Sequence, residues 1–193
     1  TGFFLDQRDH RVFLSAVARD RTVLNCFSFS GAFSVYAFGG GAKEVVSLDS
    51  SMPALELAEK NLALNGFADA PGELLKGDAF AYLKEIESKF DLMVLDPPSL
   101  AHKRSDVDAA TGGYKFLNLH AIQHLKPGAI LLTFSCSQHL SIDLFQKVVF
   151  GAAVDARRKL AVIRRLSQPL DHPFGLQHPE GEYLKGLALV ALD

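Results

Sequence analysis

Three acids and one cysteine occupy matching places in this sequence of 193 residues. Asp49 and Asp96 end short apolar runs, and Asp78 and Cys136 come directly after two others. Short continuous runs of Val, Leu and Ile are typical of strands that are buried on both faces of a parallel sheet. Ligands bind at the carboxyl ends of such strands, so we expect these four residues to line one site. A thiol among carboxyl groups points to nucleophilic catalysis.

Patterns typical of strands and of helices alternate along the chain, and the predicted elements must position these four residues. The runs with strand character are 22–27, 44–49, 72–77, 90–96, 129–135, 159–166 and 183–192. Apolar residues spaced by three and four predict helices over 52–64 and 141–158. Such alternation implies right-handed crossovers. We therefore expect an α/β, Rossmann-like fold with a mostly parallel, seven-stranded sheet and helices on both of its faces.

Two segments lack these patterns. Residues 1–20 open with a charged stretch that we interpret as an extended lead-in to the first strand. Residues 99–113 form the one long polar stretch inside the chain, and we interpret them as a loop. A loop of that length in a compact fold is usually functional or mobile.

Composition limits the classes of protein that the sequence allows. It is 48% hydrophobic with a net charge of −2, as expected for one globular domain. No apolar run is long enough to cross a membrane, no signal peptide is recognisable, and two cysteines cannot build a disulfide scaffold, so we expect a cytoplasmic protein without a membrane partner. Residues 101–193 carry 11 basic and 8 acidic side chains, so a polyanion would meet this half.

The turn after the first predicted strand indicates which cofactor could bind. It holds a single glycine, Gly31, where a dinucleotide-binding turn needs G-x-G-x-x-G, and no phosphate-binding P-loop is present. Asp49, 18 residues further on, is well placed to bind ribose hydroxyls. A nucleoside cofactor without phosphates, such as S-adenosylmethionine (SAM), fits both observations. An NAD-dependent oxidoreductase remains a distant alternative.

Cys136 suggests which atom would receive a methyl group. Direct transfer to a nitrogen needs no thiol, whereas C5 of a pyrimidine is not nucleophilic by itself. Addition of a thiolate to C6 makes C5 reactive. Asp96, on the neighbouring predicted strand, would then bind the N3/N4 edge of the ring, and Pro97 and Pro98 would stiffen the pocket wall.

Several motifs carry a family resemblance. D-P-P-S at 96–99 and F-S-C-S at 134–137 resemble motifs IV and VI of class I methyltransferases that act on pyrimidine C5. Together with the stretches 1–11, 23–37 and 171–186, they make the whole chain similar to the bacterial 23S ribosomal RNA cytosine-C5 methyltransferase family. The resemblance implies a class I methyltransferase fold, SAM as cofactor and methylation of cytosine through a covalent adduct between the cysteine and C6. Family members carry an RNA-binding PUA domain before this region, so the chain is expected to be a single catalytic domain.

The resemblance also assigns cofactor roles. Gln7 or Arg8 would reach the methionine end of SAM, Asp49 the ribose, and Asp78 with Ala79 the adenine. The full set implied for the cofactor is Gln7, Arg8, Asn25, Phe27, Ser28, Phe29, Gly31, Asp49, Ser50, Asp78, Ala79 and Asp96.

On the substrate side, the resemblance implies that Cys136 is the nucleophile and that Tyr114 and Lys115 face RNA. The expected partner is 23S rRNA, naked or in a partly assembled large subunit, and an oligomer is compatible with the sequence. The alternative is a SAM-dependent enzyme that methylates a purine nitrogen of rRNA. We expect no metal, because His120 and His124 lack an H-E-x-x-H pattern and fit a solvated helix face.

Overall fold

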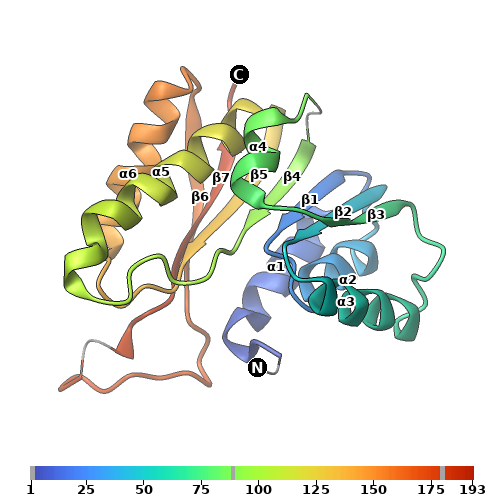
Figure 1. Cartoon of the computed structure of the whole chain (residues 1–193), viewed down its shortest axis with the longest axis horizontal. Helices are drawn as coiled ribbons and strands as arrows, with labels where there is room; N and C mark the ends of the chain where they lie inside the picture. The colour runs from blue at the N-terminus through green and yellow to red at the C-terminus, as the bar shows by residue number, and fades with distance from the viewer. Residues whose placement is uncertain (1–2, 88–89, 179–180) are drawn as a thin grey trace.

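A single seven-stranded sheet runs through the computed structural model, which describes residues 3–87, 90–178 and 181–193 (Figure 1). The strand order is β3-β2-β1-β4-β5-β7-β6. Strands β1 to β5 pair in parallel, and β7 runs antiparallel to both β5 and β6. The predicted α/β fold with a mostly parallel, seven-stranded sheet is confirmed. The strands are β1 Thr22–Cys26, β2 Glu44–Asp49, β3 Gly72–Lys76, β4 Phe90–Leu95, β5 Leu125–Ser135, β6 Leu160–Ser167 and β7 Lys185–Ala191.

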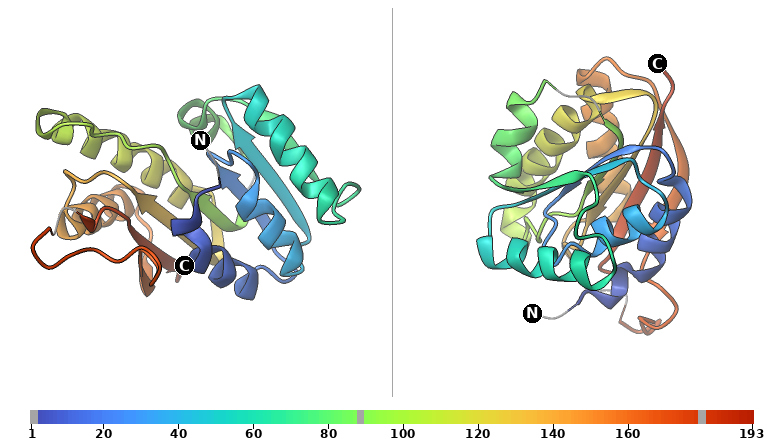
Figure 2. Two further views of the ribbon diagram at one scale, coloured as in Figure 1. Left: turned by 90° about the horizontal axis from the view of Figure 1, so that it is seen from below. Right: turned by 90° about the vertical axis from the view of Figure 1, so that its right-hand side faces the viewer.

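Helices cover both faces of the sheet (Figure 2). Helices α1 and α2 build one hydrophobic core with the sheet, with α3 beside α2, whereas α4, α5 and α6 build the core of the opposite face. The helices are α1 Arg8–Val17, α2 Ala32–Gly39, α3 Met52–Leu64, α4 Ala79–Glu85, α5 Val107–Gln123 and α6 Ile142–Asp155, with 3-10 turns η1 Leu5–Gln7 and η2 Arg104–Asp106. Both helices predicted from apolar spacing are confirmed. None of the helices in the described ranges is long and apolar enough to cross a membrane.

The prediction of an extended lead-in over residues 1–20 is wrong, because η1 and α1 occupy most of that segment. The buried side of α1 presents His10, Arg11 and Leu14, which are spaced by one and three residues. Phe13, Leu14, Val17 and Ala18 pack on the same core, but this apolar stripe is confined to the second half of the segment, after the polar residues His10 and Arg11. Helix α1 packs closely on the end of α2, since a Cβ on Gly40 would collide with the carbonyl oxygen of Ser15.

The prediction of a loop over 99–113 is also wrong in its second half, because α5 begins at Val107. The carboxylate of Asp106 accepts hydrogen bonds from the backbone N–H groups of His102 and Lys103 and organises the turn before the helix. Gly113 suggests a loop in the sequence, but it lies inside α5, where a Cβ would be 3.0 Å from Leu100 Cδ1. The glycine allows the preceding loop to approach the helix closely.

The sheet topology fixes where a site can form. Strand β1 pairs with β2 on one side and β4 on the other, so the connections after β1 and β4 leave in different directions. A crevice is expected at the carboxyl ends of these strands, where the strand order reverses.

Candidate active site

A cavity of about 850 Å³ lies at this edge of the sheet. Its walls come from the N-terminal segment, the loop after β1, the ends of β2, β4 and β5, and the residues before β7. It brings together most of the site residues predicted from the sequence. Those that line it are Gln7, Phe27, Ser28, Phe29, Asp49, Ser50, Asp96, Pro97, Pro98 and Cys136.

Asp49 holds the loop after β1 in place. Its Oδ2 accepts a hydrogen bond from the Phe29 N–H at 2.8 Å, and its Oδ1 accepts one from the Ser51 N–H at 2.9 Å. Phe27 and Phe29 both have positive φ, 59° and 46°, a conformation that is strained for residues other than glycine. The carboxylate therefore stabilises a costly loop conformation at the cavity wall.

Asp96 follows β4 directly and lines the cavity, with a hydrogen bond from Gln7 Nε2 to its Oδ1 at 3.0 Å. Gln7 is buried, and its Oε1 lies 2.6 Å from Nδ1 of His10, so this ring nitrogen donates. Burial lowers the pKa of His10 to about 4 and raises the pKa of Asp96 to about 7; nearby Asp6 adds to the Asp96 shift, and Gln7 and Arg11 oppose it. Asp96 can therefore exchange a proton near neutral pH.

Cys136 follows β5 directly, and its Sγ lies 4.0 Å from the carbonyl oxygen of Pro97. Burial raises the pKa of the thiol, the negative charge of Asp96 raises it further, and Lys185 opposes both. At neutral pH Cys136 is therefore a neutral thiol. The parallel pairing of β4 with β5 brings this thiol and Asp96 to the same cavity.

Two predicted RNA-facing residues lie elsewhere. Tyr114 is only 1% exposed in α5, and its hydroxyl accepts a hydrogen bond from Ser135 Oγ at 3.0 Å, so the prediction that it faces RNA is wrong. An aromatic residue after a polar stretch suggested exposure, but the helix turns it into the core. Lys115 is half-exposed, and it pairs with Asp155 of α6 at 2.7 Å, away from the cavity lining.

Some predicted cofactor residues are not part of the cavity wall. Asn25 is buried and donates a hydrogen bond to Ser34 Oγ at 2.9 Å, which fixes α2 against β1. Asp78 caps α4 by accepting from the Ala81 N–H at 2.9 Å, and Ala79 begins that helix. Neither residue of this pair lines the cavity.

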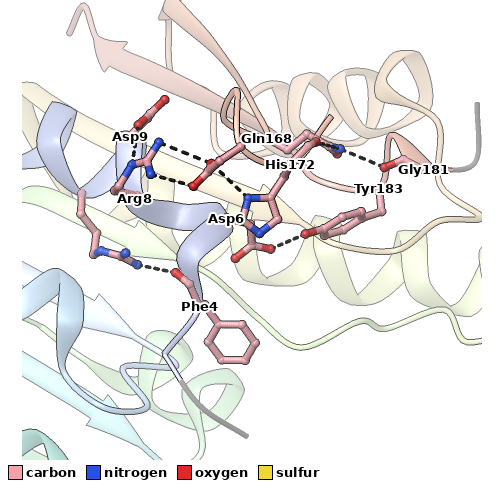
Figure 3. A network of polar contacts seen from close by, with 10 residues as sticks. Phe4, Asp6, Arg8, Asp9, Gln168, His172, Gly181 and Tyr183 are labelled. Atoms are coloured by element: carbon pink, nitrogen blue, oxygen red, sulfur yellow. Dashed lines mark hydrogen bonds and ion pairs between the residues drawn. The ribbon is translucent and has the colours of Figure 1, made fainter. Parts of the chain in front are cut away.

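Two further predicted residues have other roles in the structure. Gly31 has φ of 72° and caps α2, where a Cβ would lie 2.8 Å from Ala58 Cβ. Arg8 is exposed and forms an ion pair with Asp171 at 2.7 Å (Figure 3). It does not line the cavity, whereas Gln7, the other residue expected at the methionine end, does.

The N-terminal segment and the loop before β7 meet beside the cavity. Tyr183 donates a hydrogen bond to Asp6 Oδ2 at 2.7 Å, and the Arg8–Asp171 ion pair ties the same two segments together (Figure 3). Asp6, Tyr183 and His172 all line the cavity. Sequence reasoning missed Asp6 and Tyr183, although both lie in stretches that carry the family resemblance, because their contact joins residues 177 positions apart.

Arg11 is a further cavity residue that the sequence did not reveal. It is 2% exposed, and its Nη1 donates a hydrogen bond to the carbonyl oxygen of Phe4 at 2.8 Å. Its guanidinium lies 4.2 Å from the centre of the Phe3 ring. Its Nε and Nη2 have no hydrogen-bond partner within the described residues. An incompletely paired cation therefore lies at the cavity wall.

The described part of the chain holds no group of three or more His, Cys, Asp or Glu side chains that could bind a metal. His120 packs its ring 4.3 Å from that of Phe116 on the same helix.

A family model described as S-adenosylmethionine-dependent methyltransferase matches residues 1–179. The chain belongs to this family. As a member, the methyltransferase uses SAM, as the sequence predicted, and the distant alternative of an NAD-dependent oxidoreductase is set aside. Its cavity, with an acid at the end of β2 and no phosphate-binding turn after β1, is consistent with that cofactor.

The methyltransferase is similar to proteins named Ribosomal RNA large subunit methyltransferase I. The protein from Alteromonas mediterranea is 47% identical over 100% of this chain and 49% of its own length, and that from Tolumonas auensis is 48% identical over 100% and 49%. The chain thus spans about half the length of the curated relatives it matches. Among solved structures, SMU.776, crystallised as a complex with SAH, has a TM-score of 0.88 and 27% identity, and covers 98% of this chain and 50% of its own.

The raised pKa of Asp96 predicts how the stability of the protein depends on pH. The folded state binds the Asp96 proton more tightly than the unfolded state, so wild type loses stability as pH rises from about 4 through 7. Asp96→Asn cannot ionise, and its free energy of unfolding relative to wild type should rise by about 2–4 kcal/mol between pH 4 and pH 8. Urea denaturation at several pH values measures this difference. The exposed control Asp143→Asn should not show it, and a pH-independent difference for Asp96→Asn would contradict the burial of a charged carboxylate.

Proposed function

We propose that this domain transfers a methyl group from SAM to C5 of a cytosine in large-subunit (23S) ribosomal RNA. The observation that carries the proposal is that Cys136 and Asp96 line one cavity with the residues expected to bind the cofactor. A thiol beside an acid with a pKa of about 7 is suited to addition to a pyrimidine and has no use in methylation of a nitrogen. The names of the relatives support large-subunit rRNA as the substrate.

In the proposed reaction, Cys136 loses its proton and its sulfur forms a bond to C6 of the cytosine. The electron pair of the C5–C6 bond moves toward C5 and the N3 edge, where the protonated Asp96 donates a hydrogen bond to N3. When bound, SAM would supply the electrophilic methyl group, which bonds to C5 as its bond to the sulfonium sulfur breaks and S-adenosylhomocysteine leaves. A base then removes the C5 proton, the Cys136–C6 bond breaks, and the thiolate is regenerated. The target base must leave its stack to reach both side chains.

The residues around the cavity fit SAM in two respects. Asp49 uses each oxygen for one backbone N–H and keeps further lone pairs for ribose hydroxyls. Arg11 lacks partners for two nitrogens, and Ala32 and Phe33 of the first turn of α2 line the same cavity. A buried cation and a helix N-terminus both favour an anion. We therefore assign the methionine carboxylate to Arg11, in place of the exposed Arg8.

We also propose that residues 1–193 act as one catalytic domain, in the cytoplasm, on naked rRNA or a partly assembled large subunit. One sheet with a core on each face supports a single domain. The relatives are about twice as long as this chain, so an RNA-binding domain would fit in the part of their sequence outside the match.

The proposed function predicts a specific product. Full-length protein incubated with SAM and protein-free large-subunit rRNA should yield 5-methylcytidine, detected by mass spectrometry of the digested RNA. Cys136→Ser should lose the product while still binding SAH, and Cys26→Ala, in the buried core, should keep it. A methylated purine in place of 5-methylcytidine would contradict the proposal and favour nitrogen methylation.

The assignment of Arg11 predicts a selective loss of cofactor affinity. Arg11→Ala should raise the Kd for SAH by about 10- to 100-fold, because a charge-assisted hydrogen bond contributes about 1.5–3 kcal/mol. Calorimetry should detect no such change for methylthioadenosine, which lacks the carboxylate. Arg8→Ala is the matched control and should bind SAH as wild type does. Equal losses for both ligands would instead indicate a collapsed cavity.

A further inference from the structure

A buried lysine lies beside the nucleophile. Lys185 is the first residue of β7 and is 4% exposed. In the antiparallel pairing of β5 with β7 it stands opposite Ser135, the residue before Cys136. Sequence and topology together therefore place an amine next to the strand end that carries the thiol.

The ammonium group of Lys185 is bound to the turn that follows the nucleophile. Its Nζ donates hydrogen bonds to the carbonyl oxygens of Ser137 at 2.5 Å and Leu140 at 2.7 Å. The same turn is closed by a backbone hydrogen bond from the Leu140 N–H to the Ser137 carbonyl oxygen at 3.2 Å. Lys185 therefore restrains the backbone on the far side of Cys136, while β5 restrains it on the near side.

A lysine in this position is costly. Among the described residues, no carboxylate forms an ion pair with it, and burial lowers its pKa to about 8, with Cys136 and Glu182 opposing that shift. Two carbonyl oxygens compensate the lost water only in part. A neutral side chain could pack against the turn without this cost, so the charge itself calls for an explanation.

The charges that act on Cys136 come from three elements. Asp96 after β4, in its ionised form, and Asp6 of η1 favour the neutral thiol, as burial does. Lys185 of β7 is positive and favours the thiolate. The proposed reaction starts from the thiolate, which is the nucleophilic form of cysteine. The positive charge of Lys185 thus opposes the effect of the two carboxyl groups on the thiol.

We propose that Lys185 is a positioning residue for Cys136, which holds the turn 137–140 and supplies the positive charge that stabilises the thiolate. This inference rests on the proposed function, in which Cys136 is the nucleophile. It adds a requirement for charge that the family resemblance did not assign.

Alkylation of the thiol tests the inference without RNA or methyl transfer. Iodoacetamide forms a carbon–sulfur bond with the thiolate, iodide leaves, and the thiol proton goes to solvent. The rate of alkylation of full-length protein against pH, followed by mass spectrometry of the Cys136 peptide, gives the relative amount of thiolate at each pH. Cys26 is fully buried and should not react in the folded protein.

Two variants separate charge from hydrogen bonding. Lys185→Gln can still donate to the turn but is neutral. The acidic limb of its pH–rate profile should move upward by about one pH unit, so its rate at pH 7, where Lys185 of the wild type is charged, should be about tenfold lower. Lys185→Arg keeps the charge and should keep the rate at pH 7 near that of wild type. Lys115→Gln, a lysine on the surface of α5, should have no effect.

In methylation assays, the acidic limb of the plot of kcat against pH should move upward by about one pH unit in Lys185→Gln, while KM for SAM stays constant. An unchanged alkylation rate at pH 7 in Lys185→Gln would overturn the charge role. A loss of rate in Lys185→Arg as large as in Lys185→Gln would overturn it as well. If the rate falls as expected but no 5-methylcytidine is ever formed, the proposed function fails while the effect of Lys185 on the thiol stands.

Discussion

The parallel pairing of β4 with β5 is the constraint on which the site depends. Leu95 pairs with Thr133, so the chain leaves β4 at Asp96 and leaves β5 at Cys136 beside one another. Neighbouring strands lie about 4.8 Å apart, which is close enough for two side chains to address one base. The loop after β1 and the end of β2 complete the cavity, because β1 is paired to β4 on its other side.

Several ionisable side chains near this strand pair are buried, which costs free energy. Burial raises the pKa of Asp96 to about 7, lowers that of Lys185 to about 8, and lowers that of Arg11. Arg11 and Lys185 come from opposite ends of the chain, yet both lie beside the cavity or its nucleophile. Costs of this kind concentrate where a ligand or a reaction compensates them. The distribution of buried charge therefore supports the same site as the strand topology.

The sequence allowed prediction of the features that repeat locally. Continuous apolar runs indicated the strands, and the residues at their ends, such as Asp49, Asp96 and Cys136, line the cavity as expected. Contacts between distant segments could not be predicted, because nothing local in Asp6 or Tyr183 indicates that they meet. Helix α1 was missed because its apolar stripe of Phe13, Leu14, Val17 and Ala18 is short and follows His10 and Arg11, which are buried but look like surface residues in a sequence. The prediction for Tyr114 was wrong for the converse reason. The polar stretch before it suggested exposure, but part of that stretch begins α5, and the helix places Tyr114 in the core.

The central claim, a covalent bond between Cys136 and C6 of the target cytosine, can be tested by trapping. Fluorine at C5 blocks removal of the C5 proton, so RNA that carries 5-fluorocytidine should stay attached after methyl transfer. Full-length protein would be incubated with SAM and this RNA, digested, and analysed by mass spectrometry. The account predicts a methylated fluorocytidine on the peptide that contains Cys136. Methylation of ordinary RNA with no adduct on fluorinated RNA would contradict it.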